Sequence, residues 1–226
     1  MYGKLPSKRD FVACSAPRSF LRVWEPWIQN GLWNSKVHLG DQWKQTYLSA
    51  PIWRFWLGAE ICSGITVAGA FTPSVDSIGR CFPLTVFVSA LKPIGILHPE
   101  IDLQNAWFSQ LERLLLSALD PRASFEALLQ RLEMLERHVD HSVPIPEEEI
   151  AMLRDGTMAA TATKASLEER QVTARAADYV GTYGMKSVWW TIGWKEHPAT
   201  TLVSQDMPSP NFFTTLLTGC FDGRVI

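Results

Sequence analysis

The spacing of the hydrophobic positions changes several times along this chain, and each change predicts a change of element. Apolar residues recur three or four positions apart at 20–28, 41–48, 103–118 and 125–139, which predicts amphipathic helices. A further helix is expected from Ser209 to Leu217, with Gly219 ending it. Short runs rich in β-branched and aromatic residues predict five strands, at Ile52–Leu57, Ile65–Phe71, Pro83–Ser89, Ser187–Ile192 and Thr200–Ser204.

Prolines and small residues add detail to this pattern. Pro17 suits the first turn of the first helix, whereas Pro26 lies inside that helix and is expected to kink or divide it. Tyr2–Leu5 predicts a short extended piece. Pro146, followed by three glutamates, predicts the start of a short helix. Residues 156–166 are small and polar, and a mobile loop is expected there.

The order of these elements predicts the fold class. Short connections between the first three strands favour antiparallel pairing over helical crossovers. Strands lie on both sides of a helical middle, without repeats or a Pro/Gly-rich linker, which indicates a single domain over residues 1–226. We expect an α/β fold of the αβα sandwich type, with a mostly antiparallel or mixed sheet of about five strands and helices on both faces.

Composition limits the classes of partner. The chain has 226 residues, 46% of them hydrophobic, which is enough for a sizeable core, and its net charge of −2 argues against binding nucleic acid. Charge is unevenly distributed: residues 1–60 carry eight basic and four acidic side chains, and residues 97–170 carry seven and fourteen. Such asymmetry fits a polarised surface that steers a protein partner. Two ordinary solvated helix faces are the favoured interpretation.

Cysteine spacing and hydropathy predict the cellular compartment. The 4 cysteines are widely spaced, which fits a reducing compartment. The first residues do not form an apolar signal sequence, and the uncharged stretch Ile61–Val75 is too short to span a bilayer. We therefore expect a cytoplasmic protein without membrane insertion.

Motifs that would indicate catalysis are weak. The chain has no Gly-x-Ser-x-Gly motif, and Gly184–Ser187 resembles the end of a phosphate loop without its first glycine. His138 and His141 have a spacing that suits a metal but no recognisable further ligands, which favours two surface histidines. Neither a metal site nor a cofactor is expected.

Two other features attract attention. Asp76 and Arg80 are the only charged residues between Ile61 and Leu91, and isolated charges are costly to bury unless paired. Arg80 is expected to bridge back to Asp76 within a turn, an interpretation stronger than a nucleophilic triad built on Ser74 and Asp76. Trp189 and Trp190 are adjacent in a predicted strand, so one is expected to be buried while the other covers a helix or is exposed as an interaction anchor.

Five blocks of sequence, in order and spread over nearly the whole chain, resemble the TagF family, also called ImpM, of type VI secretion-associated proteins. The blocks are Tyr2–Pro6 with Asp10–Val12, Ala50–Phe55, Pro73–Asp76 with Gly79–Thr85, Ser187–Gly193, and Met207–Pro208 with Phe213–Gly219. Arg9 stands where the family usually has glycine, and Cys81 where it often has an aromatic residue.

This resemblance implies a cytosolic, non-enzymatic repressor that acts after translation on type VI secretion by binding the system's forkhead-associated (FHA) scaffold protein. The family blocks supply the candidate binding residues, which are Lys4, Asp10, Arg54, Ser74, Asp76, Arg80, Trp189 and Trp190. The alternative is a small-molecule or nucleotide-sensing module in which Arg54, Asp76 and Arg80 line a pocket. A hydrolase using Ser74 is the least supported reading.

Overall fold

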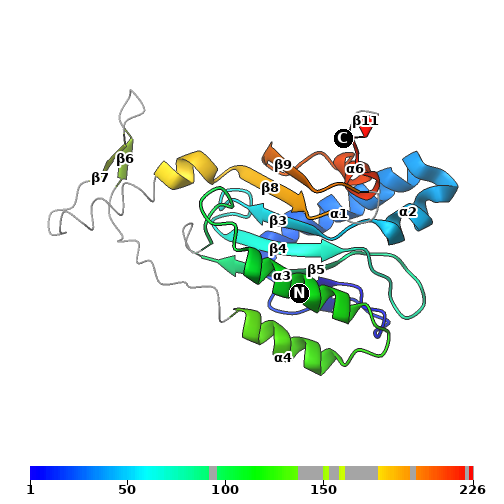
Figure 1. The fold of residues 1–226 in the computed structure, drawn as a ribbon. Coiled ribbons are helices and arrows are strands. Elements are labelled where there is room, and N and C mark those ends of the chain that lie inside the picture. The colour runs from blue at the N-terminus through cyan, green and yellow to red at the C-terminus, as the bar shows by residue number, and fades with distance from the viewer. Residues whose placement is uncertain are drawn as a thin grey trace.

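An antiparallel sheet of seven strands forms the centre of the fold (Figure 1). The computed structural model describes residues 1–91, 96–136, 150–152, 158–160, 178–193, 197–221 and 224–225. The strand order is β2-β1-β5-β4-β3-β8-β9, and every neighbouring pair is antiparallel. These strands are β1 (Tyr2–Gly3), β2 (Val12–Ala13), β3 (Trp53–Leu57), β4 (Thr66–Thr72), β5 (Leu84–Ala90), β8 (Lys186–Thr191) and β9 (Thr200–Gln205).

Helices supply the rest of the described core. They are α1 (Arg18–Leu39), the short 3-10 helix η1 (Gly40–Gln42), α2 (Trp43–Ser49), α3 (Asn105–Ala118), α4 (Phe125–Glu136) and α6 (Phe212–Thr218). Residues 178–183 are also helical. Two small hairpins complete the described part of the chain, one pairing β6 (Ile150–Met152) with β7 (Met158–Ala160), the other β10 (Cys220–Phe221) with β11 (Arg224–Val225).

Aromatic residues dominate the core between the sheet and α1, α2 and α6. Because side chains alternate along a strand, Phe55 and its register partner Trp189 point to this face, where Trp24 of α1 stacks against both. Their ring centroids lie 4.4 Å and 5.8 Å from Trp24. Gly69 lies opposite Phe55 on β4, and a Cβ there would come within 2.9 Å of its ring. The glycine therefore makes room for the aromatic cluster.

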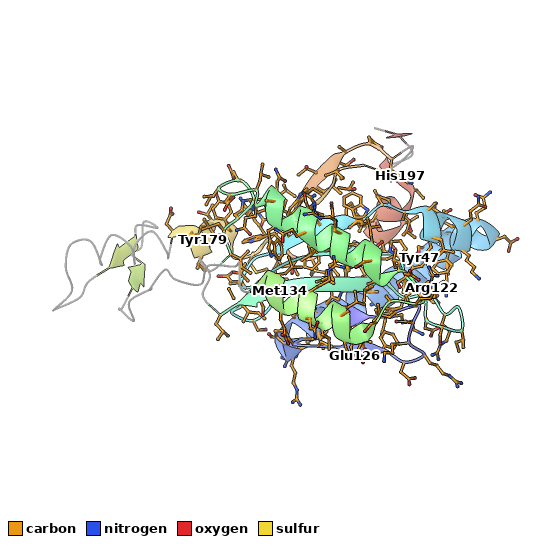
Figure 2. All side chains as sticks on the ribbon, turned by 60° about the horizontal axis from the view of Figure 1, so that its bottom comes forward. Tyr47, Arg122, Glu126, Met134, Tyr179 and His197 are labelled. Carbon is orange, nitrogen blue, oxygen red and sulfur yellow. The ribbon has the colours of Figure 1, made fainter. Side chains whose placement is uncertain are left out.

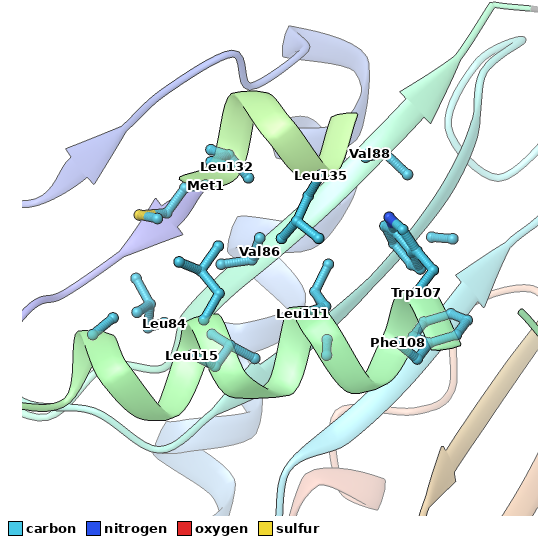
Figure 3. Packing of buried hydrophobic residues seen from close by; sticks show 14 of the residues in the cluster. Met1, Leu84, Val86, Val88, Trp107, Phe108, Leu111, Leu115, Leu132 and Leu135 are labelled. Carbon is cyan, nitrogen blue, oxygen red and sulfur yellow. The ribbon is translucent and has the colours of Figure 1, made fainter. Parts of the chain in front are cut away.

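Aliphatic residues form the core on the other face, beneath α3 and α4. Leu111 and Leu115 of α3 and Leu132 of α4 pack over β5, where Leu84 and Val86 point toward them (Figure 3). The two helices contact each other and lie in front of the sheet in Figure 2. Interdigitated aliphatic side chains thus hold this helical hairpin to the sheet.

The α/β class and the antiparallel pairing are confirmed, but the count of about five strands is wrong. All five predicted strands are present, each within one residue of its expected bounds. The two additional strands, β1 and β2, have two residues each; β1 lies within the extended piece predicted at Tyr2–Leu5, whereas β2 is too short for a hydrophobic period to reveal. Tyr2 of β1 pairs with Thr85 of β5 and extends the sheet at this edge.

Pro26 does not divide the first helix, so of the two expected effects, a kink or a division, the division is wrong. The helix α1 runs for 22 residues through it. Proline removes one backbone hydrogen bond of the helix. Trp24, Trp27 and Ile28 are buried on both sides of it, and their packing against the core compensates for the lost bond. Pro26 itself faces solvent.

Some expectations concern residues outside the described part. These are the helix beginning at Pro146, the histidines His138 and His141, and most of the loop at 156–166. Within that loop, the described residues Met158–Ala160 form strand β7.

Candidate functional site

The loop between β4 and β5 is built around the carboxylate of Asp76. Its Oδ1 accepts hydrogen bonds from the backbone N–H groups of Ile78, at 3.1 Å, and Arg80, at 2.9 Å. The N–H of Gly79 donates to the carbonyl oxygen of Asp76 at 2.9 Å, and Gly79 has φ +82°, a left-handed conformation that favours glycine. Asp76 therefore shapes the turn that leads into β5.

Two cations meet the second oxygen of the same carboxylate. Asp76 Oδ2 accepts hydrogen bonds from Nζ of Lys4 and, at 2.5 Å, from Nε of Arg80. The side chains of Asp76 and Lys4 are buried, whereas 54% of the Arg80 side chain is exposed. Burial alone would raise the pKa of Asp76, but the hydrogen bonds from Lys4 and Arg80 and from two backbone N–H groups outweigh it and hold the pKa well below its usual range. The predicted Asp76–Arg80 pair is confirmed.

Ser74 connects this ion-pair cluster to the N-terminal strand and to α2. Its Oγ donates to the backbone oxygen of Lys4 at 2.7 Å. The hydroxyl of Tyr47 donates to the backbone oxygen of Ser74 and accepts from its N–H, both at 3.0 Å. Burial raises the pKa of Tyr47, which therefore stays neutral. Ser74 thus serves as a structural connector, with its hydroxyl directed to a carbonyl.

Arg54 forms a second buried ion pair on the opposite face of the sheet from the aromatic core. Its Nε lies 2.7 Å from Oε1 of Glu112 on α3, and its Nη1 donates to Oδ1 of Asn105 at 3.2 Å. The guanidinium carbon lies 5.4 Å from the ring centroid of Phe108. This arrangement ties β3, an interior strand of the sheet, to α3.

A cavity of about 310 Å³ opens beside this second pair. Most of its lining is apolar, and among the described residues that line it Glu112 alone is charged. Three exposed apolar side chains, Leu48, Leu116 and Ile192, lie at the cavity. The other lining residues are Ser49, Ala50, Pro51, Ile52, Thr72, Pro73, Leu119, Thr191 and Gly193. A pocket of this size and chemistry is suited to a small apolar group with one hydrogen-bond donor.

The two adjacent tryptophans are both buried. Trp189 is fully buried in the aromatic core, and its Nε1 donates to Ser187 Oγ at 3.0 Å. Trp190 is 7% exposed and lies edge-on to Phe108 of α3, with ring centroids 4.7 Å apart. The alternative in which one of them stands exposed as an anchor is wrong. Asp10 is exposed in the loop between β1 and β2.

A buried histidine lies elsewhere in the described structure. His98 stacks on Tyr183, with ring centroids 4.2 Å apart, and meets the ring of Trp56 edge-on. Its Nε2 is buried and has no hydrogen-bond partner among the described residues. Burial lowers the pKa of His98, and the nearby carboxylate of Glu100 partly opposes this effect. The neutral imidazole is therefore the form that the fold accommodates.

Two contacts could not be assigned from the sequence. Lys4 lies 72 positions from Asp76, and Glu112 lies 58 positions from Arg54. One feature of the sequence could have indicated that Glu112 needs a partner: its carboxylate lies next to the apolar stripe of a predicted helix, where an unpaired charge would be costly. Across the described ranges, no group of three or more His, Cys, Asp and Glu side chains could hold a metal ion, and none of the helices there could cross a bilayer.

Comparison with known proteins identifies the family. Residues 1–135 match the family described as TagF N-terminal domain, type VI secretion system-associated, so the chain belongs to this family. A similar solved structure is the crystal structure of PA0076 from Pseudomonas aeruginosa PAO1, with 30% sequence identity and a TM-score of 0.72. The similarity covers 98% of this chain and 94% of that one. No match to a curated protein was found.

Proposed function

We propose that this protein is a non-enzymatic, cytoplasmic regulator that represses type VI secretion after translation by binding the system's FHA scaffold protein. Membership of the type VI secretion-associated TagF family supports this role most directly. The structural likeness to PA0076 extends the relationship to nearly the full length of both chains.

The contacts of the polar candidate residues agree with a binding role for the protein. Lys4 forms an ion pair with Asp76 and accepts a hydrogen bond from Ser74 through its carbonyl oxygen, and Arg54 forms an ion pair with Glu112. These contacts stabilise a loop and a strand and leave the surface around them to contact a partner. A buried ion pair is costly to break, so such residues fix one geometry of that surface.

A binding and secretion experiment tests this role. The purified protein should bind the purified FHA scaffold, and an unrelated FHA domain should serve as the negative control. Overproducing the protein should reduce effector secretion while the amounts of the other secretion components stay constant. Absence of binding, or a fall in those amounts that accounts for the effect, would contradict repression by direct contact.

The cavity beside Glu112 favours a second candidate, a small-molecule-sensing module. None of the three residues expected to share a pocket lines this cavity: Arg54 lies behind its wall and contacts Glu112, and Asp76 and Arg80 belong to the other cluster. A ligand at a hundredfold its Kd should stabilise the fold by about 2.7 kcal/mol. In a chain of this size that raises Tm by about 5–11 °C.

Nucleotides, small acids and apolar amines should be screened by thermal shift, with Leu116→Trp as the control that fills the mouth of the cavity. Leu116 is 59% exposed, so this change should leave the core intact. A flat profile for the unaltered protein would exclude sensing of these compounds.

A further inference from the structure

The surface around the 76–80 turn combines basic and apolar side chains. Arg9, Lys36, Lys44 and Arg80 are exposed there, together with Phe11 and Ile78, whose exposed fractions are 48% and 58%. We call this set the basic face.

Hydrogen bonds hold two loops of the basic face together. The backbone N–H of Ser77 donates to the carbonyl oxygen of Lys8 at 2.9 Å. Nη2 of Arg80 donates to the carbonyl oxygen of Arg9 at 2.7 Å. The ring of Phe11 lies edge-on to Phe82, with centroids 4.8 Å apart. The β1–β2 loop and the β4–β5 loop therefore present one fixed surface, which lowers the entropic cost of binding.

The end of α1 and the helix α2 extend the same surface. Lys44 lies on α2 three residues before Tyr47, whose hydroxyl bonds to Ser74 at the base of the turn. Burial raises the pKa of the Cys81 thiol beside that turn, and the ammonium groups of Lys44 and Lys36 are close enough to oppose the increase. These two lysines thus border the loops from the helical side.

The charge of these segments is opposite in sign to that of the chain. Residues 1–12, 36–44 and 74–82 together carry six basic and three acidic side chains, a net charge of +3, whereas the whole chain carries −2. The rest of the chain therefore carries −5. Within these segments, Lys4 neutralises the buried Asp76, so the guanidinium of Arg80 adds positive charge at the surface. Such a field attracts an acidic partner and steers its approach.

We propose that the basic face binds an acidic segment of the partner protein that also carries an apolar side chain, an assignment that rests on the proposed function. Phe11 and Ile78 supply apolar contact area, and the surrounding cations supply charge complementarity. A protein fits this surface better than nucleic acid does, because the overall charge is negative and the exposed acids Asp10 and Asp41 lie in the same segments.

Charge reversal tests the assignment with the full chain and the purified FHA scaffold. The variant Arg9→Glu/Lys44→Glu should weaken binding at least tenfold, and its affinity should depend less on salt than that of the unaltered protein. The matched control is Arg22→Glu/Arg113→Glu, which makes the same charge change at exposed helical positions. Arg22 lies 14 residues before Lys36 on α1, a separation of about 21 Å. This control should keep its affinity within twofold.

Each result decides one point. Equal melting temperatures of both variants confirm that the fold is intact. If the unaltered protein does not bind the scaffold, the proposed function fails and the assignment with it. If it binds and Arg9→Glu/Lys44→Glu binds equally well, only the basic face is overturned. Flotation with phosphatidylglycerol vesicles should show no binding; binding that the reversal abolishes would assign the face to a membrane surface instead.

Discussion

Removing the carboxylate of Glu112 should destabilise the protein severely, because it leaves a buried guanidinium without its counter-ion. Arg54 is 3% exposed on β3, the strand paired with both β4 and β8. Two unit charges about 4 Å apart attract by about 4 kcal/mol at an effective dielectric constant of about 20. Breaking a buried ion pair from one side costs about 3–5 kcal/mol, which agrees with that value.

The expected shift in melting temperature follows from the size of the chain. For 150–250 residues, 1 kcal/mol changes Tm by about 2–4 °C, so Glu112→Ala should lower Tm by about 6–20 °C. The double variant Arg54→Met/Glu112→Leu should recover most of this loss, since it removes both desolvated charges at once. Calorimetry and guanidinium unfolding of four proteins, namely the unaltered protein, Arg54→Met, Glu112→Leu and the double variant, complete a double-mutant cycle. A single variant within 2 °C of the unaltered protein, or a double variant as unstable as the single, would refute this reasoning.

Three further changes test other parts of the structure. Asp76→Asn should lower Tm, and its stability should fall less steeply with decreasing pH than that of the unaltered protein. A carboxyl group whose pKa is lowered in the folded state stabilises the fold above its unfolded pKa of about 3.9, and it loses that effect as pH falls below this value. The exposed Asp10→Asn is its control and should do neither. The unaltered protein should become more stable as pH rises through about 6.5, because burial lowers the pKa of His98 and the fold therefore favours its neutral form. His98→Phe should remove this rise, and the control His38→Gln, at an exposed position, should retain it. Gly69→Ala should cost about 1–3 kcal/mol in chemical unfolding, since its Cβ would lie 2.4 Å from a backbone oxygen of β5, and an unchanged midpoint would show that the sheet relaxes there.

Local patterns in the sequence predicted the elements well. Hydrophobic period and turn residues located strands such as Leu84–Ala90 within one residue, because both signals lie inside the segment itself. The pairing of Asp76 with Arg80 was also predictable, since the two residues are only four positions apart in a turn. The two-residue strand β2 was not, because it is too short to show a period, and β1 was predicted only as an extended piece without its place in the sheet.

Contacts between distant segments could not be read from the sequence. Lys4 reaches Asp76 only because β1 lies beside β5, and Glu112 reaches Arg54 only because α3 crosses the sheet at that point. Burial of Trp190 has the same cause, since it depends on the ring of Phe108 from α3. From the sequence, a charged or aromatic residue in an apolar segment indicates that it needs a partner, but it does not indicate which residue that partner is.

The position of β8 has a consequence for the order of folding. Trp56 of β3 pairs with Val188 of β8, a contact between residues 132 positions apart. Closure of such a long loop is entropically costly, so this pairing is expected late. During synthesis, the edge of β3 that faces away from β4 therefore remains unpaired and apolar until β8 leaves the ribosome. A fragment ending at residue 135 would keep that edge permanently and should aggregate, although it contains every residue that matches the family description.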